Sequence, residues 1–282
     1  MQDRGLAAYI TELVGTLFLV FTICTVVILY VSTDPFGAAG AATPPTQVQF
    51  GSDFAVIGLV HAFVLFALIA GLGAVSGGHF NPAVTFAAMA LRRIDPIDGI
   101  VYILAQLAGA VGGAQLAKAF LEDEGRATNY GAVEISSLVG DKFDGMLLEA
   151  IGTFLLVLVI IAVAMNPRVR KDWAPLVIGA TLGFAVMIIG PLTGGSFNPA
   201  RWFGPALISE EWGSTWPYLV GPLLGCVLAA GFYRFVIASG EDTGGPGDAA
   251  GAAAELEKGS EAEAKTKAAE TAISDKPGGK KK

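Results

Sequence analysis

The sequence is poor in charge for its length. Aspartate, glutamate, lysine and arginine make up 15% of the 282 residues, whereas soluble globular domains average about 25%. This shortage excludes a disordered chain, a nucleic-acid-binding protein and an ordinary soluble domain. Hydrophobic residues reach 53%, so the chain has either one very large core or several membrane spans, and the placement of the charges decides between them.

Cysteine and histidine are also scarce, with two residues of each. Both cysteines, Cys24 and Cys226, lie inside apolar runs, where small buried side chains are the simplest interpretation and a disulfide is not expected. No spacing in the sequence suggests a metal or redox site. We therefore expect no cofactor, no metal, no nucleic-acid partner and no enzymatic activity.

Six stretches of the chain contain no charged residue. They cover residues 13–33, 54–91, 99–117, 150–167, 173–200 and 212–233. Each reaches the roughly 17 to 25 residues that a helix needs to cross a bilayer. The sequence therefore predicts an all-α membrane protein with six transmembrane helices.

Two of these stretches are too long for a single crossing. A span of about 20 residues leaves an apolar remainder that must enter the membrane and return on the same side. Asn81-Pro82 and Asn198-Pro199 each precede a short apolar segment, and proline suits the first turn of a helix. The expected breaks before these segments are marked by Gly71, Gly73, Gly77 and Gly78, and by Pro191, Gly194 and Gly195. We predict two re-entrant half-helices, over residues 83–91 and about 200–209.

The two halves of the chain repeat each other. Glu12-Leu-Val-Gly15-Thr16 corresponds to Glu149-Ala-Ile-Gly152-Thr153, and the two Asn-Pro-Ala triplets follow in the same order. Because each half has three spans, the second copy must be inverted relative to the first. Inverted repeats place their functional path at the repeat interface, lined by broken helices. We predict a channel domain over residues 1–240, with repeats at about 6–119 and 144–237.

Basic residues gather on one side of the predicted membrane domain. They are Arg4, Arg92, Arg93, Arg168, Arg170, Lys171 and Arg234. Such residues prefer the cytoplasm, so both termini are expected there, with outer loops at residues 32–53 and 120–144. The segment 241–282 has no aromatic residue and is expected to be a disordered cytoplasmic tail. The expected location is the cell membrane, plasma or inner.

Two motifs around the triplets are the most specific feature of the sequence. They read Ser76-Gly-Gly-His79-Phe-Asn-Pro-Ala-Val-Thr85 and Gly194-Gly-Ser-Phe-Asn-Pro-Ala-Arg201. Both resemble the signature loops of the aquaporin, or major intrinsic protein, family, and the resemblance extends over residues 6–233. It implies six spanning helices with two half-helices, passive conduction of water and small neutral solutes, and a homotetramer with one pore in each subunit.

The triplets Asn81-Pro82-Ala83 and Asn198-Pro199-Ala200 suggest how such a pore excludes protons and ions. Each proline begins a half-helix whose unpaired N–H groups and positive dipole end lie at the membrane centre. A water between the two Asn amides presents its oxygen to both, so its hydrogens point away and a proton wire is interrupted. The positive ends also repel cations. The simpler alternative is that each Asn is only a helix N-cap.

Arg201 marks the expected selectivity filter. It lies three residues beyond Asn198 in a half-helix that points outward, roughly 4 to 5 Å from the membrane centre at about 1.5 Å per residue. An arginine inside the membrane is costly enough to indicate function. The family resemblance places the other filter positions at His61, Val186 and Gly195. A structural role in the core is the alternative for His61.

The composition of this filter resembles that of plant tonoplast intrinsic proteins, which implies water together with ammonia or urea as solutes. Typical water-selective members carry Phe in place of His61 and His in place of Val186, so strict water selectivity is not expected. Glycerol facilitators usually carry Asp after the filter arginine, where this chain has Trp202. A glycerol facilitator is one alternative. An ion-coupled secondary transporter is another, because inverted repeats and intramembrane glutamates also occur there.

Four further polar residues are expected to support or line the pore. The resemblance implies that Glu12 and Glu149 hold loop carbonyls in place, and a proton relay is the alternative. Gln106 in the third span is expected to tie down the same loops. His79 precedes the first triplet by two residues and is expected to line the inner vestibule, with pH sensing as the alternative.

Overall fold

The computed structural model describes residues 5–31, 52–166, 169 and 171–238. The expectations for Arg4, Arg168, Arg170, most of the first outer loop and the tail after residue 240 concern residues outside these ranges. Every element in the described ranges is helical. In chain order they are α1 (Gly5–Tyr30), α2 (Ser52–Ser76), α3 (Pro82–Ala90), α4 (Pro96–Phe120), α5 (Glu122–Arg126), η1 (Asn129–Gly131), α6 (Lys142–Ile160), η2 (Ile161–Met165), α7 (Ala174–Thr193), α8 (Pro199–Ser209), α9 (Thr215–Phe232) and η3 (Tyr233–Ile237).

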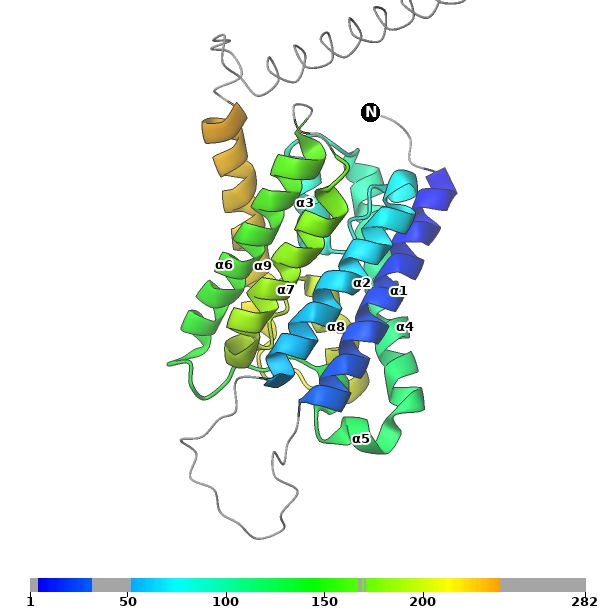
Figure 1. Ribbon diagram of the computed structural model, residues 1–282, viewed down its shortest axis with the longest axis vertical. Coiled ribbons are helices and arrows are strands. Elements are labelled where there is room, and N and C mark those ends of the chain that lie inside the picture. Colours follow the sequence, from blue (N-terminus) through cyan, green and yellow to red (C-terminus); the bar gives the residue numbers. More distant parts are fainter. Residues whose placement is uncertain (1–4, 32–51, 167–168, 170, 239–282) are drawn as a thin grey trace, which may run out of the picture.

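Six of the described helices are long and apolar enough to cross a membrane. They are α1, α2, α4, α6 with η2, α7, and α9 with η3, while α3 and α8 are the two short half-helices. The start of α1 and the end of η3 lie at the same end of the bundle (Figure 1). The predicted all-α membrane fold with six spans and two half-helices is confirmed.

The helices before the half-helices end later than the glycine and proline pattern predicts. α2 continues through Gly71 and Gly73, and α7 continues through Pro191, so the breaks expected at these three residues are wrong. The chain instead leaves the helix at Gly77 and Gly194, whose φ angles are 95° and 78°. Left-handed backbone of this kind ends a helix, and glycine adopts it without steric cost.

The packing of the helices follows the inverted repeat. α1 packs against α4 as α6 packs against α9, and α2 meets α7 across the interface between the halves. A Cβ atom added at Gly109 or Gly113 would collide with the backbone of α1, and one at Gly225 would collide with the backbone of α6. Glycine at these crossings therefore lets the helix backbones approach closely.

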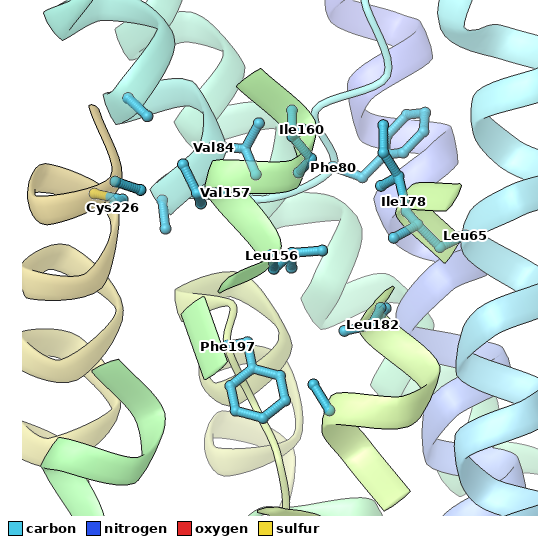
Figure 2. Packing of buried hydrophobic residues seen from close by; sticks show 14 of the residues in the cluster. Leu65, Phe80, Val84, Leu156, Val157, Ile160, Ile178, Leu182, Phe197 and Cys226 are labelled. Atoms are coloured by element: carbon cyan, nitrogen blue, oxygen red, sulfur yellow. The ribbon is translucent and has the colours of Figure 1, made fainter. Parts of the chain in front are cut away.

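Two phenylalanines fix the signature loops to the helices. The ring of Phe80 fills the space beside Gly15, and the ring of Phe197 fills the space beside Gly152, so that any Cβ at either glycine would overlap the ring. Figure 2 shows both rings in the buried cluster with apolar side chains from several helices. The loops are thereby held at the centre of the molecule, where the two halves meet.

Candidate functional site

Each half-helix begins with the proline of an Asn-Pro-Ala triplet, and the asparagine caps it. The side-chain oxygen of Asn81 accepts a hydrogen bond from the Ala83 N–H at 2.8 Å. That of Asn198 accepts one from the Ala200 N–H at 2.9 Å. These bonds satisfy donors that the first turn of a helix leaves free. The N-cap interpretation therefore describes part of what each asparagine does.

The amide nitrogens of the same asparagines join the two halves. Asn81 Nδ2 donates to the Phe197 carbonyl, and Asn198 Nδ2 donates to the Phe80 carbonyl, each at 2.9 Å. One amide hydrogen of each asparagine is thus used on the opposite loop, and both residues still line a common cavity. The sequence analysis missed these reciprocal bonds. Their acceptors are backbone carbonyls, so no residue type in the sequence marks them.

The two buried glutamates bind the N–H groups of the loops. Glu12 accepts from the N–H groups of His79 at 3.0 Å and Phe80 at 2.7 Å, and from the Ser76 hydroxyl at 2.6 Å. The carboxyl oxygens of Glu12 contact donors and not carbonyls, since an oxygen that accepts a hydrogen bond needs a donor as its partner. Glu12 fixes loop carbonyls indirectly, through the peptides that carry them.

Glu149 repeats this arrangement in the second half. Its carboxylate accepts from the N–H groups of Ser196 at 3.0 Å and Phe197 at 2.7 Å, and from the Thr193 hydroxyl at 2.6 Å. Glu12 and Glu149 are both fully buried. Each carboxylate is therefore occupied by three donors of its own loop.

Gln106 and His79 belong to a polar network that lies in the first half. Gln106 Nε2 donates to Glu12 at 2.8 Å and to the Thr85 hydroxyl at 2.9 Å. His79 Nδ1 lies 3.0 Å from the same hydroxyl, and its ring packs edge-on against Tyr102. His79 also lines the larger of the two cavities described next.

The described residues line two adjoining cavities. The larger, of about 660 Å³, is lined by Arg93 and Lys171 and reaches the two asparagines of the triplets. The smaller, of about 300 Å³, is lined by residues that include Glu134. Arg201 lines both, so its side chain lies where they meet.

Residues on three elements mark the boundary between the cavities. On α2, His61 lines the larger cavity and Ile57, one turn away, lines the smaller. On α7, Leu182 lines the larger cavity and Gly190 the smaller, so Val186 lies between them. In the loop before α8, Ser196 and Gly194 line the larger and the smaller cavity, and Gly195 lies between them. The two cavities therefore meet at the level of His61 and Arg201, and Val186 and Gly195 lie at the same level while lining neither cavity.

His61 and Arg201, which lie where the two cavities meet, have hydrogen-bonding atoms without a partner. His61 Nδ1 lies 2.7 Å from the Ile57 carbonyl, and since a carbonyl only accepts, Nδ1 carries the hydrogen. His61 Nε2 is buried and has no partner among the described residues, so it presents a lone pair. Arg201 is 2% exposed and donates from Nη1 to the Gly131 carbonyl at 2.7 Å, while its Nε is also without a partner. The lining of the larger cavity thus includes one residue with an unpartnered acceptor, His61, and one with an unpartnered donor, Arg201.

Six membrane-length helices, two half-helices linked through their capping asparagines and two cavities that share Arg201 define a membrane channel. A model of the family described as "Major intrinsic protein" matches residues 2–233, and the chain belongs to this family.

Several individual proteins are similar to the chain. An Oryza sativa subsp. japonica protein named "Probable aquaporin TIP2-2" is 36% identical over 84% of this chain and 90% of its own length. A Lactiplantibacillus plantarum protein named "Glycerol uptake facilitator protein-like 6" is 36% identical over 79% of this chain and 94% of its own length. The X-ray structure of the aquaglyceroporin from Plasmodium falciparum superposes with a TM-score of 0.67 at 23% identity, covering 85% of this chain and 99% of that one. This last similarity supports the fold.

Proposed function

We propose that this channel passes water and other small neutral solutes, with ammonia and urea among them, passively down their gradients. The observation that carries the proposal is the meeting of the two cavities at Arg201, where His61 and Arg201 have unused polar groups, and we propose that this is the constriction of the path. A solute that both donates and accepts hydrogen bonds can exchange its water partners for these two groups. Water, ammonia and urea all meet this requirement.

The size of the constriction favours solutes somewhat larger than water. Val186 and Gly195 are neighbours, since a Cβ atom at Gly195 would lie 3.4 Å from Cγ2 of Val186. The two residues supply one short aliphatic side chain and no side chain at all. We propose that they form the wide side of the selectivity filter, opposite the polar side formed by His61 and Arg201.

The centre of the path carries the proposed barrier to protons and ions. The half-helices α3 and α8 both begin there, so their positive dipole ends face the lumen beside the amides of Asn81 and Asn198. No aspartate or glutamate is among the described residues that line the larger cavity. This arrangement disfavours cations and favours a channel over an ion-coupled transporter, which needs a group to carry the coupling ion.

A glycerol facilitator is the second candidate, supported by the name of the relative from Lactiplantibacillus plantarum. The residues at the constriction oppose it. None of the four is phenylalanine or tryptophan, and Trp202 after Arg201 is buried, with its ring packed against those of Phe203 and Trp212. We propose glycerol as a slower solute than urea.

We further propose a homotetramer in the cell membrane with both termini in the cytoplasm. Large apolar side chains such as Leu104 and Ile188 are 61% and 68% exposed in the single chain, as expected for surfaces that face lipid or neighbouring subunits. Arg93 and Lys171 lie together at one mouth of the larger cavity, which fits the preference of basic residues for the cytoplasmic side.

The function is tested by stopped-flow light scattering on proteoliposomes. The purified protein is expected to accelerate osmotic water flow and the entry of urea and ammonia above empty liposomes, without any ion gradient. The variant Arg201→Ala is expected to raise the permeability to charged solutes about tenfold or more, since about 1.4 kcal/mol of lost barrier is a factor of ten.

The matched control is Glu122→Gln, a change of an exposed residue on α5 that lies away from the path. It should leave every permeability at the value of the unchanged protein. Absence of water flow, or solute entry that requires an ion gradient, would contradict the channel proposal. An unaltered permeability profile in Arg201→Ala would remove Arg201 from the filter.

A further inference from the structure

The outer loop before α6 contains three successive residues in left-handed backbone. The φ angles of Asn129, Tyr130 and Gly131 are 48°, 52° and 82°. Asparagine and glycine tolerate this region, but a run of three that includes tyrosine is unfavourable unless surrounding contacts hold it. Such strained turns cluster where the backbone must present a group in a fixed position.

Contacts on both sides hold this turn in place. The Gly131 N–H donates to the Thr128 carbonyl at 2.9 Å, and Asn129 Nδ2 donates to the Glu134 carboxylate at 3.1 Å. The Lys118 ammonium lies 4.8 Å from the centre of the Tyr130 ring, a distance typical of a cation–π contact. The turn is therefore anchored to α4 and to the loop that follows it.

Asn129 of the strained turn lines the smaller cavity, and the Gly131 carbonyl is turned toward Arg201. This carbonyl accepts a hydrogen bond from Arg201 Nη1 at 2.7 Å. Within the described part of the chain the guanidinium donates no second hydrogen bond. Arg201 is 2% exposed, so apart from molecules in the path its guanidinium has no alternative acceptor among the described residues. The position of Arg201 across the constriction consequently depends on where the Gly131 carbonyl lies.

Gly131 in turn rests on Cys24 of α1. A Cβ atom at Gly131 would lie 2.8 Å from Cα, 3.1 Å from Cβ and 3.2 Å from Sγ of Cys24, so the two residues are already in contact. Cys24 is fully buried. On the same helix Ile23 lines the larger cavity and Val27 the smaller, which places Cys24 at the level of the constriction but behind its wall.

We propose that Cys24 is a positioning residue that determines specificity without touching the solute. Its side chain sets the position of the Gly131 carbonyl, and this carbonyl sets the position of Arg201 and thus the width of the filter. A larger side chain at residue 24 pushes the turn outward and withdraws the acceptor from Arg201. A smaller one leaves a void behind Gly131 and lets the carbonyl relax inward. The inference rests on the proposed function, because it takes Arg201 as part of the filter.

The test measures the ratio of urea permeability to water permeability in proteoliposomes. This ratio does not change when only the folded fraction changes, because both permeabilities then fall together. Cys24→Leu is expected to raise the ratio about tenfold, the effect of losing one hydrogen bond to a charged group. Cys24→Ala and Gly131→Ala provide two further variants should the leucine prevent folding, and both are expected to shift the ratio by at least about twofold.

The other cysteine of the chain supplies the matched control. Cys226 is equally buried, in α9, and its thiol donates to the Leu223 carbonyl in a cluster away from Gly131. Cys226→Leu and Cys226→Ala are expected to change stability and to leave the urea-to-water ratio unchanged. A ratio shift in these variants as large as in the Cys24 variants would overturn the proposal.

A double variant separates this inference from the proposed function. If Cys24 acts through Arg201, then Cys24→Leu combined with Arg201→Ala shows the ratio of Arg201→Ala alone. Full additivity of the two effects, or a normal ratio in the Cys24 and Gly131 variants while Arg201→Ala is altered, would overturn the role of Cys24 and leave the filter standing. An unaltered ratio in Arg201→Ala would overturn both.

Discussion

The first half of the channel, α1 to α4, and the second half, α6 to α9, hold their signature loops with the same contacts. In each half a buried glutamate accepts the N–H of the phenylalanine before the triplet at 2.7 Å. In each half a tyrosine hydroxyl also donates to the last residue of the helix before the loop. Tyr102 donates to the carbonyl of Ser76, which ends α2, at 2.8 Å, and Tyr218 donates to the carbonyl of Thr193, which ends α7, at 2.7 Å. The scaffold is therefore duplicated.

The halves differ at the positions that face the path. Three residues beyond the triplet asparagine the first half has Val84, which lines the larger cavity, and the second half has Arg201. Two residues before it the first half has His79 and the second Ser196. A symmetric scaffold thus carries a buried arginine in the second half only. The contacts that hold the loops are shared between the repeats, whereas Arg201 and His79, which line the path, have no counterpart in the other half.

The largest expected effect comes from removing the shared glutamates. Glu12→Leu and Glu149→Leu should each lower the free energy of unfolding by about 3 kcal/mol or more, because four buried donors at Glu12 and three at Glu149 lose their acceptor at about 1 to 3 kcal/mol each. The measurement is unfolding in mixed micelles of a mild detergent and sodium dodecyl sulfate. Glu122→Leu, at an exposed ion pair, is the control and should cost less than about 0.5 kcal/mol.

The same measurement can contradict the conclusion that the two halves hold their loops with equivalent contacts. A loss below about 1 kcal/mol in either variant would mean that its loop is held by other contacts. A large difference between the two losses would mean that the halves do not share one scaffold.

A smaller loss of stability, similar in the two halves, is expected from substitutions at the glycines on which the phenylalanine rings pack. Gly15→Ala and Gly152→Ala should each destabilise the protein by about 1 to 3 kcal/mol, because the new methyl group overlaps the ring of Phe80 or Phe197. The same unfolding measurement applies. Gly71→Ala on α2 is the control, since a Cβ atom there meets nothing within 4 Å, and it should be neutral or stabilising. Tolerance of alanine at Gly15 or Gly152 would contradict the packing described here.

The smallest loss of stability is expected from removing Gln106, whose hydrogen bonds have no counterpart in the second half. Gln106→Leu should cost less than about 1 kcal/mol, because Glu12 keeps three other donors and the substitution removes the buried Gln106 Oε1, which has no partner. Position 222, which corresponds to it in α9, is already a proline. Unfolding of Gln106→Leu beside Glu12→Leu measures the difference. A loss as large as that of Glu12→Leu would make Gln106 part of the essential scaffold.

The spanning helices and half-helices of this protein, and their order along the chain, can be predicted from the sequence alone. Placing a charge in a bilayer is costly, so the six charge-free runs indicate the spans directly, and the remainder of two runs indicates the half-helices. The repeat of the Glu12 and Glu149 segments determined the inverted symmetry by simple counting. Helix ends were less well predicted, because Gly71, Gly73 and Pro191 lie within helices whose ends are set by the backbone at Gly77 and Gly194.

The hydrogen bonds that hold the triplets and Arg201 in place can be seen only in the tertiary structure. The bond from Asn198 to the Phe80 carbonyl joins residues 118 apart, and the bond from Arg201 to the Gly131 carbonyl joins residues 70 apart. The acceptors are backbone carbonyls, which every residue has, so no residue type in the sequence marks them. Their positions depend on how the helices pack and on a left-handed turn whose conformation is stabilised by contacts beyond its own residues. That is why the triplets and Arg201 could be found by inspection, while the groups that hold them in place could not.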